Sequence, residues 1–220
     1  MKKITLLVIV FFAIMQFSCK DDEPLDGTTF SKSFIQVYRN ADSIDIKLES
    51  NDTCTLPMFI VYFSGEDCSI GDSVKFNNIA AKNNDISYNK NLVPYSNIVV
   101  YDTLTAISVV CSQDFSSKYT HGVNLSEIIN FCSFTPYNFI QNGYKYTNLK
   151  RQSDIGLRYD YGYEPIDCVS SEIHTQQVKC FAPYCYFYFT EHPSISGTYT
   201  FEVTIKLSEK TLKNTVTMEF

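Results

Sequence analysis

The feature that most constrains the fold is an alternation of apolar and polar residues near the end of the chain. The apolar members stand at every second position, and they are Tyr199, Phe201, Val203, Ile205 and Leu207. Because successive side chains of a β-strand point to opposite faces, this pattern predicts a strand with one buried face. Residues 208–211 predict a turn, after which residues 212–220 alternate in the same way. The two segments together predict a C-terminal β-hairpin.

Other segments also have the composition of strands. Ile44, Ile46 and Leu48 alternate with charged residues, as in a strand with one face in water. Residues 58–63 and 184–189 are apolar on both faces, which is typical of central strands that are covered on both sides. Short strands separated by turn signals predict a mostly β protein. We expect an antiparallel β-sandwich that is immunoglobulin-like in general build.

One short helix is expected near residues 125–131. Asn124 is a suitable N-cap residue, and Glu127 stands three positions later as the reciprocal partner of a capping box. Val123 and Ile128 have the spacing of a hydrophobic staple. A helix of this length most simply connects two strands.

The start of the chain has the layout of a lipoprotein signal peptide. Lys2 and Lys3 precede an apolar run from Ile4 to Phe17, and Cys19 follows Ser18. As a helix, this run would measure about 21 Å, whereas the hydrocarbon core of a membrane is about 30 Å thick. We therefore expect a cleaved signal at 1–18, lipidation of Cys19, a flexible acidic tether over 19–32, and a single β-sandwich domain over 33–220.

Several stretches carry a resemblance to a known group of proteins. Gln16–Cys19 is a loose lipobox similar to those of Bacteroidetes lipoproteins, and Cys19–Glu23 resembles their surface-export signal, a lysine and acids after the lipidated cysteine. His121–Ile128, Gly143–Tyr144 and Gly197–Phe201 also resemble segments of the small surface lipoproteins of this group. The resemblance implies an outer-membrane protein that is held in the lipid through Cys19 and faces the cell exterior. It implies no activity.

The charge of the chain excludes one class of partner. Cleavage after residue 18 would remove two lysines and no acids, so the formal net charge would change from −6 to −8. Nucleic acids and acidic membrane surfaces attract clustered Lys and Arg side chains, and the sequence has no such cluster. We expect no nucleic acid partner.

The cysteines predict disulfides, because an exported chain meets an oxidising environment. Seven remain after Cys19: Cys54, Cys68, Cys111, Cys132, Cys168, Cys180 and Cys185. Proximity favours Cys180 with Cys185, around a turn that contains proline, and Cys54 with Cys68, which flank a strand-like run. The alternative is that several are buried free thiols that behave as small apolar side chains. Cys111, in an apolar run, fits that alternative.

The sequence contains no common catalytic or nucleotide-binding motif, so we expect neither an enzyme nor a cofactor. Thiolate and imidazole ligands occur close together in one segment: Cys168, His174, Cys180, Cys185 and His192. Such ligands suit Zn²⁺, which makes a metal-binding protein or a metal-dependent enzyme one alternative. Their spacings match no known zinc motif, and disulfide pairing is the preferred interpretation.

The most prominent candidate binding surface is aromatic. Tyr159, Tyr161 and Tyr163 stand at alternate positions near the carboxylates of Asp160 and Glu164. On a strand the three rings would share one face, which could stack against sugars or hold a peptide. The alternative is that the rings cover the core. We expect a cell-surface, non-catalytic binding domain for a glycan, a peptide or a partner protein. A purely structural role in an outer-membrane assembly is a further alternative.

Overall fold

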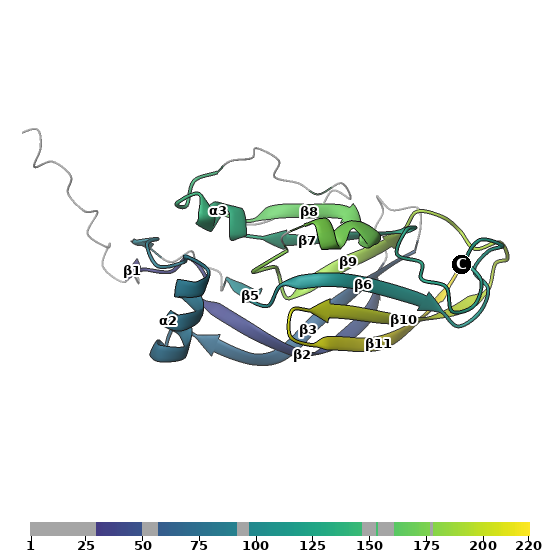
Figure 1. Cartoon of the computed structure of the whole chain (residues 1–220), viewed down its shortest axis with the longest axis horizontal. Coiled ribbons are helices and arrows are strands. Elements are labelled where there is room, and N and C mark those ends of the chain that lie inside the picture. Colours follow the sequence, from purple (N-terminus) through teal and green to yellow (C-terminus); the bar gives the residue numbers. More distant parts are fainter. Residues whose placement is uncertain (1–29, 50–56, 92–96, 147–152, 154–160, 177) are drawn as a thin grey trace, which may run out of the picture.

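Strands make up most of the regular secondary structure, as Figure 1 shows. The computed structural model describes residues 30–49, 57–91, 97–146, 153, 161–176 and 178–220. The strands are β1 (Phe30–Ser31), β2 (Val37–Glu49), β3 (Met58–Ser69), β4 (Lys90–Asn91), β5 (Ile98–Val100), β6 (Leu104–Cys111), β7 (Ile129–Thr135), β8 (Glu164–Val169), β9 (Tyr184–Phe189), β10 (Thr198–Leu207) and β11 (Thr211–Glu219). The helices are α2 (Ser73–Lys82), α3 (Tyr137–Gln141) and a 3₁₀ helix at Ser170–Thr175.

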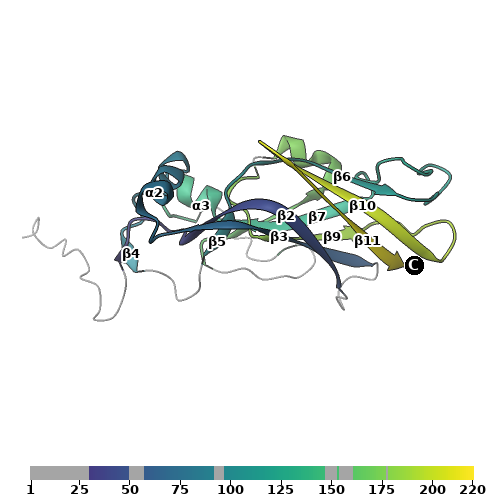
Figure 2. The same ribbon diagram turned by 90° about the horizontal axis from the view of Figure 1, so that it is seen from below.

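Two sheets form the body of the molecule. The larger has the strand order β5-β2-β3-β9-β7-β8, and the smaller has the order β11-β10-β6. Strands β2 and β5 are parallel, whereas the other paired strands are antiparallel. Strands β10 and β11 lie across β2 and β3 (Figures 1 and 2). The side chain of Asn214 in β11 donates a hydrogen bond of 2.7 Å to the Ile44 carbonyl in β2.

The main core lies between the two sheets and is rich in phenylalanine. The rings of Phe59 in β3 and Phe187 in β9 stack with their centroids 5.0 Å apart. Phe189 of the larger sheet meets Phe201 of the smaller sheet at 5.1 Å. All four side chains belong to one buried cluster with residues from both sheets. The predicted mostly β fold, with two facing sheets, is therefore confirmed.

The predicted C-terminal hairpin is also confirmed. Strand β10 pairs with β11, from Thr198 opposite Glu219 to Lys206 opposite Thr211. The five apolar residues of the alternating pattern all belong to the buried core, and they are Tyr199, Phe201, Val203, Ile205 and Leu207. Residues 58–63 and 184–189 lie in β3 and β9, two adjacent strands inside the larger sheet, as expected of central strands.

The prediction of a helix near residues 125–131 is wrong. This segment is a turn followed by the start of β7. The Oδ1 atom of Asn124 accepts hydrogen bonds from the backbone N–H groups of Ser126, within the turn, and of Val109, in β6. Glu127 pairs instead with Lys118, at 3.2 Å. The capping residue thus ties a turn to a neighbouring strand and begins no helix.

Helix α2 was not expected, although a signal for it is present. Phe76, Ile79 and Ala80 are apolar at helical spacing, and all three are buried. They belong to a second core cluster, together with Phe34 and Tyr38. Nothing in the described residues forms a helix with enough length and apolar character to cross a membrane.

The second cluster surrounds a carboxylate that is fully buried. Asp85 follows α2, and its two oxygens accept hydrogen bonds from the backbone N–H groups of Phe34 and Ile35, at 2.7 and 2.9 Å. They also accept from the hydroxyls of Tyr38 and Tyr144, at 3.0 and 3.1 Å. Without Asp85, each of these donors would be unsatisfied in an apolar core. Because two of them are the backbone N–H groups of Phe34 and Ile35, Asp85 fixes the path of the chain just before β2.

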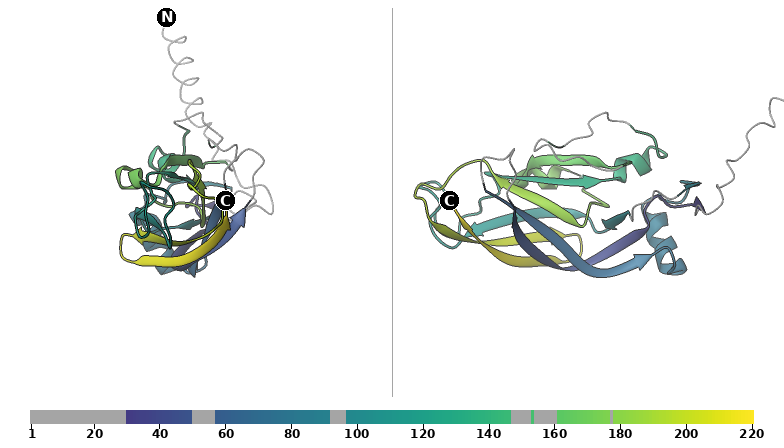
Figure 3. Two further views of the ribbon diagram at one scale, coloured as in Figure 1. Left: turned by 90° about the vertical axis from the view of Figure 1, so that its right-hand side faces the viewer. Right: turned by 180° about the vertical axis from the view of Figure 1, so that it is seen from behind.

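The last residues of the predicted tether belong to the folded part. Phe30 and Ser31 form β1, which pairs with β4, and Ser31 is buried. The carbonyl of Lys32 accepts a hydrogen bond of 2.8 Å from the Tyr88 N–H. This end of the molecule also carries α2 and α3, and the C-terminus lies at the opposite end (Figures 1 and 3). Cys19 lies outside the described residues.

Candidate functional site

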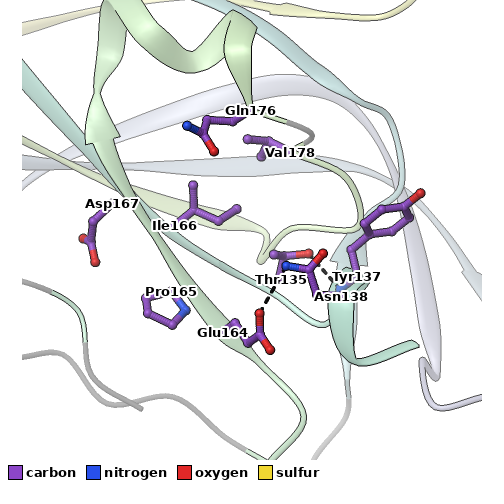
Figure 4. A pocket seen from close by; sticks show the side chains of 9 residues that line it. All are labelled: Thr135, Tyr137, Asn138, Glu164, Pro165, Ile166, Asp167, Gln176 and Val178. Carbon is purple, nitrogen blue, oxygen red and sulfur yellow. Dashed lines mark hydrogen bonds between the residues drawn. The ribbon is translucent and has the colours of Figure 1, made fainter. Parts of the chain in front are cut away.

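A polar pocket of about 380 Å³ lies beside β8 and is the candidate functional site (Figure 4). Its lining comes from β7 and α3, from β8, and from the segment after the 3₁₀ helix. The lining residues are Thr135, Tyr137, Asn138, Glu164, Pro165, Ile166, Asp167, Gln176 and Val178. Ligand pockets in proteins have volumes of roughly 300–1,000 Å³, so the space suits a small ligand or a short segment of chain.

Strand β8 is an edge strand of the larger sheet in the described residues, because its neighbour there is β7. Pro165 in β8 lies opposite Phe134 in β7. The carbonyl of Phe134 accepts a hydrogen bond of 2.7 Å from the N–H of Ala182, which lies on the other side of β7. Phe134 and Pro165 therefore form a pair without mutual hydrogen bonds, and Pro165 needs no N–H group in the ladder.

This register determines where the backbone of β8 points. In an antiparallel pair, hydrogen-bonded and non-hydrogen-bonded positions alternate. Asp167 and Val169 follow Pro165 at every second position, so their backbone N–H and C=O groups point away from β7, as the C=O of Pro165 does. These groups face the side of β8 away from β7, where the described residues place no further strand, and four residues of β8 line the pocket.

The turn between β7 and α3 positions one wall of the pocket. Pro136 ends the strand, and Thr135 joins three segments there. Its hydroxyl donates to the Lys179 carbonyl at 2.6 Å and accepts from the Tyr137 N–H at 3.0 Å. The ammonium group of Lys179 lies over the Tyr137 ring, 5.4 Å from its centroid. One ring face of Tyr137 is thus already occupied by a cation.

Two carboxylates define the charge of the pocket. Glu164 is buried, and Oε2 of its side chain accepts a hydrogen bond of 3.2 Å from Asn138 Nδ2. Asp167 is opposite Cys132 in β7, and its carboxylate and that thiol form a hydrogen bond. Burial first, and then this negative neighbour, raise the pKa of the Cys132 thiol. Cys132 is therefore a neutral donor to Asp167.

The expected tyrosine face does not form as predicted. Tyr159 and Asp160 lie outside the described residues. Tyr161 and Gly162 form a turn instead of a strand. Tyr161 is exposed and packs edge-on against Phe139, whereas Tyr163 is buried, so the two rings do not share one open face.

Gly162 explains why the chain turns at this place. Its φ angle is +85°, and a Cβ atom there would lie 2.5 Å from Cζ of Phe34. Its N–H donates a hydrogen bond of 2.8 Å to the Tyr146 hydroxyl. Of the predicted binding surface, Glu164 is the residue that lines the pocket.

The predicted disulfide between Cys180 and Cys185 is wrong, because both are free thiols. Cys185 lies in the core between the sheets, whereas Cys180 lies in the cluster around Asp85. The larger sheet separates these two clusters, so proximity in sequence does not bring the two thiols together. Cys68 is also a buried free thiol, and Cys54 lies outside the described residues. Cys111 is buried and free, as the alternative interpretation expected.

The alternative metal site is not formed either. Within the described ranges, no three His, Cys, Asp or Glu side chains are grouped so that they could hold a metal ion. Cys168 is half-buried in β8, and burial raises the pKa of its thiol to about 11. His174 and His192 are exposed, and Nδ1 of His174 contacts the Ser171 carbonyl at 2.9 Å. The five predicted ligands therefore lie in different environments.

A second pocket, of about 330 Å³, lies beside α2. Its lining residues are Lys75, Asn78, Ile79, Lys82, Asn83 and Tyr101. Lys75 is already paired with Glu66, at 2.8 Å, which reduces the positive charge of this pocket. The pocket beside β8 combines more polar groups with an edge strand, and we regard it as the better candidate.

Sequence reasoning missed most of this site. Thr135, Tyr137, Asn138, Gln176 and Val178 come from two segments that carry no recognisable motif. The one local signal was Thr135-Pro136, which is typical of the end of a strand. No protein-family model, no curated protein and no solved structure matches this chain.

Proposed function

We propose that the chain is a non-catalytic binding protein of the outer membrane, anchored through Cys19 and facing outward, whose pocket beside β8 holds an extended, basic segment of a peptide or partner protein. The lipobox at Gln16–Cys19 and the acidic residues after it support the location. The binding role rests on one observation. A pocket of suitable size lies beside β8, an edge strand among the described residues, and the backbone groups of β8 that point away from β7 are oriented to pair with an added strand.

The charge of the pocket supports a basic ligand. Glu164 and Asp167 are both in the lining, and no lysine, arginine or histidine is among the nine lining residues. The side-chain amides of Asn138 and Gln176 add donors and acceptors at the same place. A lysine or arginine side chain of the bound segment would meet at least one carboxylate, while its backbone pairs with β8.

The arrangement of acids supports binding rather than catalysis. Glu164 and Asp167 are three residues apart in one strand, so their side chains leave opposite faces and their backbones lie roughly 10 Å apart. They therefore cannot flank one bond as a pair of catalytic acids does. His121, His174 and His192 are exposed and are not part of the pocket lining.

A binding assay tests the proposal. The purified full-length chain is titrated into labelled, extended peptides that carry lysine at alternate positions, and fluorescence polarisation measures the Kd. Val169→Pro should weaken binding about tenfold, because it removes one outward N–H group. Its φ angle of −65° already suits proline, so the fold should be kept. Glu172→Gln, which removes an exposed acid outside the pocket lining, is the matched control.

Two outcomes would contradict the proposal. If no peptide of the series binds, or if Val169→Pro binds as the native chain does, the edge of β8 is not the binding surface. A glycan array in the same experiment covers the other ligand expected from the sequence. Binding of glycans without peptides would replace the proposed ligand class.

A further inference from the structure

Three reactive side chains meet where the two sheets come together. Asn40 belongs to β2, Asp102 lies between β5 and β6, and Lys210 lies in the turn between β10 and β11. The Nζ atom of Lys210 donates a hydrogen bond to Oδ1 of Asn40. The same Nζ atom is 3.5 Å from Oδ2 of Asp102. The ammonium group therefore contacts an amide and a carboxylate at once.

The carboxylate in this group is unusual. The side chain of Asp102 is only 8% exposed, and within the described residues its Oδ2 atom has no hydrogen-bond partner. Burial makes a charged carboxylate costly unless it is paired and hydrogen-bonded.

The surrounding backbone holds the three groups in place. At Gly65 of β3, a Cβ atom would lie 2.0 Å from the Asn40 carbonyl oxygen, so β2 and β3 approach closely at Asn40. Within the β10–β11 turn, the Leu207 N–H donates to the Lys210 carbonyl at 2.8 Å. The Ser208 N–H donates to the Thr103 carbonyl, also at 2.8 Å, and so fastens the turn beside Asp102.

We propose that Lys210 and Asn40 become joined by an intramolecular isopeptide bond, with Asp102 as the group that carries the protons. Nζ is in hydrogen-bond contact with Oδ1 of Asn40, and the reacting carbon Cγ is one covalent bond farther on. A nucleophile and a carbonyl held together in this way react as if at very high concentration. An adjacent acid–base group is the other requirement for such an attack.

The steps balance without a cofactor or an oxidant. Asp102 takes a proton from the Lys210 ammonium, and the free amine attacks Cγ of Asn40. Asp102 then gives its proton to Nδ2 of Asn40 and takes the second proton from Nζ. The Nζ–Cγ bond forms, the Cγ–Nδ2 bond breaks, and ammonia leaves. The products are one secondary amide and one ammonia molecule, which accepts the remaining proton.

The bond would link the two sheets covalently. Asn40 and Lys210 are 170 positions apart, and the link would run from β2 of the larger sheet to the hairpin of the smaller one. The bond would give the domain a covalent cross-link, as the predicted disulfides would have done. The six cysteines of the described residues are free thiols.

Peptide mapping of the full chain tests the proposal. Trypsin should release residues 40–47 joined to residues 207–213, because a modified Lys210 is no longer cut. The joined species should weigh about 17 Da less than the sum of its two peptides, the mass of the ammonia lost. Tandem mass spectrometry should place the link on Asn40 and Lys210.

Variants separate the chemistry from the contact. Asp102→Asn keeps the shape of the side chain but cannot carry the proton, and it should reduce the joined species at least tenfold. Glu209→Gln, an exposed acid in the same turn, should leave it unchanged. If the native chain gives unlinked residues 40–47 and separate fragments cut after Lys210, the isopeptide bond does not form. Full linkage in Asp102→Asn would contradict the role of Asp102.

Discussion

The hydroxyl of Tyr38 donates a hydrogen bond of 3.0 Å to the carboxylate of Asp85, and both side chains are fully buried. Burial is the main reason why the pKa of Tyr38 is raised, and the charge of Asp85 adds to it. The hydroxyl therefore stays protonated and donates to Asp85 at the point where the chain enters β2.

Removal of this acceptor should be strongly destabilising. Asp85→Ala would leave two backbone N–H groups and two tyrosine hydroxyls without their partner. Since each buried donor left unsatisfied costs about 1–3 kcal/mol and four donors are affected, we expect a loss of at least about 4 kcal/mol in the free energy of unfolding. Urea denaturation measures it. Asp45→Ala, at an exposed position of β2, should change it by less than about 0.5 kcal/mol.

The same residue should make stability depend on pH. Burial raises the pKa of Asp85 above its ordinary value of 3.8, although the four hydrogen bonds partly oppose this shift. The folded state therefore binds the proton more tightly than the unfolded state does. The contribution of Asp85 to stability is complete below 3.8 and is lost as the pH rises through the raised pKa.

Comparison with Asp85→Asn isolates this effect, because the amide does not titrate. As the pH rises, the native chain should become less stable relative to Asp85→Asn, as measured by the difference in their free energies of unfolding. Urea denaturation at a series of pH values measures this difference. A difference that stays constant, or that shifts the other way, would show that the folded-state pKa is not raised.

Gly162 should tolerate no side chain. Its φ angle of +85° disfavours other residues, and a Cβ atom would lie 2.5 Å from Cζ of Phe34 and 3.1 Å from two ring carbons of Phe139. We expect Gly162→Ala to cost about 2–4 kcal/mol, from strain and from overpacking. Gly197→Ala is the matched control, because nothing lies within 4 Å of its added Cβ. Thermal and urea unfolding of both variants make the comparison, and an equal loss in the two would contradict the explanation.

The cysteines should be slow to react while the chain is folded. Burial raises the pKa of the thiols of Cys68, Cys111 and Cys168, and Cys180 and Cys185 are fully buried. Iodoacetamide at neutral pH should label Cys168, the one described cysteine that is half-buried, before the others. After denaturation without a reductant, all six described cysteines should be labelled in the peptide map. Protection of Cys180 and Cys185 under those conditions would indicate a disulfide.

The parts of the fold that the sequence predicted are those set by local pattern. The alternation around Phe201 determines which face is buried, and a strand with one apolar face needs a second sheet to cover it. The predicted helix is absent for a non-local reason: the side chain of Asn124 accepts a hydrogen bond from the backbone N–H of Val109, which lies in β6. No local pattern contains that information.

The candidate site was harder to predict, because its residues come together only after folding. Glu164 could be identified from its acidic and aromatic neighbours, but Asn138 and Gln176 enter the pocket from separate segments. The contact between Asn40 and Lys210 spans 170 positions and has no sequence signature. The residues of the pocket and the pair Asn40 and Lys210 are each brought together by the topology of the sheets, which cannot be predicted from local sequence patterns.

Strand β2 has a mechanical consequence. It begins at the end of the molecule where the described chain begins, runs along the larger sheet, and pairs with β3 from Val37 to Glu49 with one irregularity. A pulling force that enters through the preceding residues would act along the strand axis, perpendicular to its inter-strand hydrogen bonds. Those bonds would be loaded together, in shear, instead of opening one after another. A load applied at that end would therefore be shared by the whole length of the β2–β3 pairing.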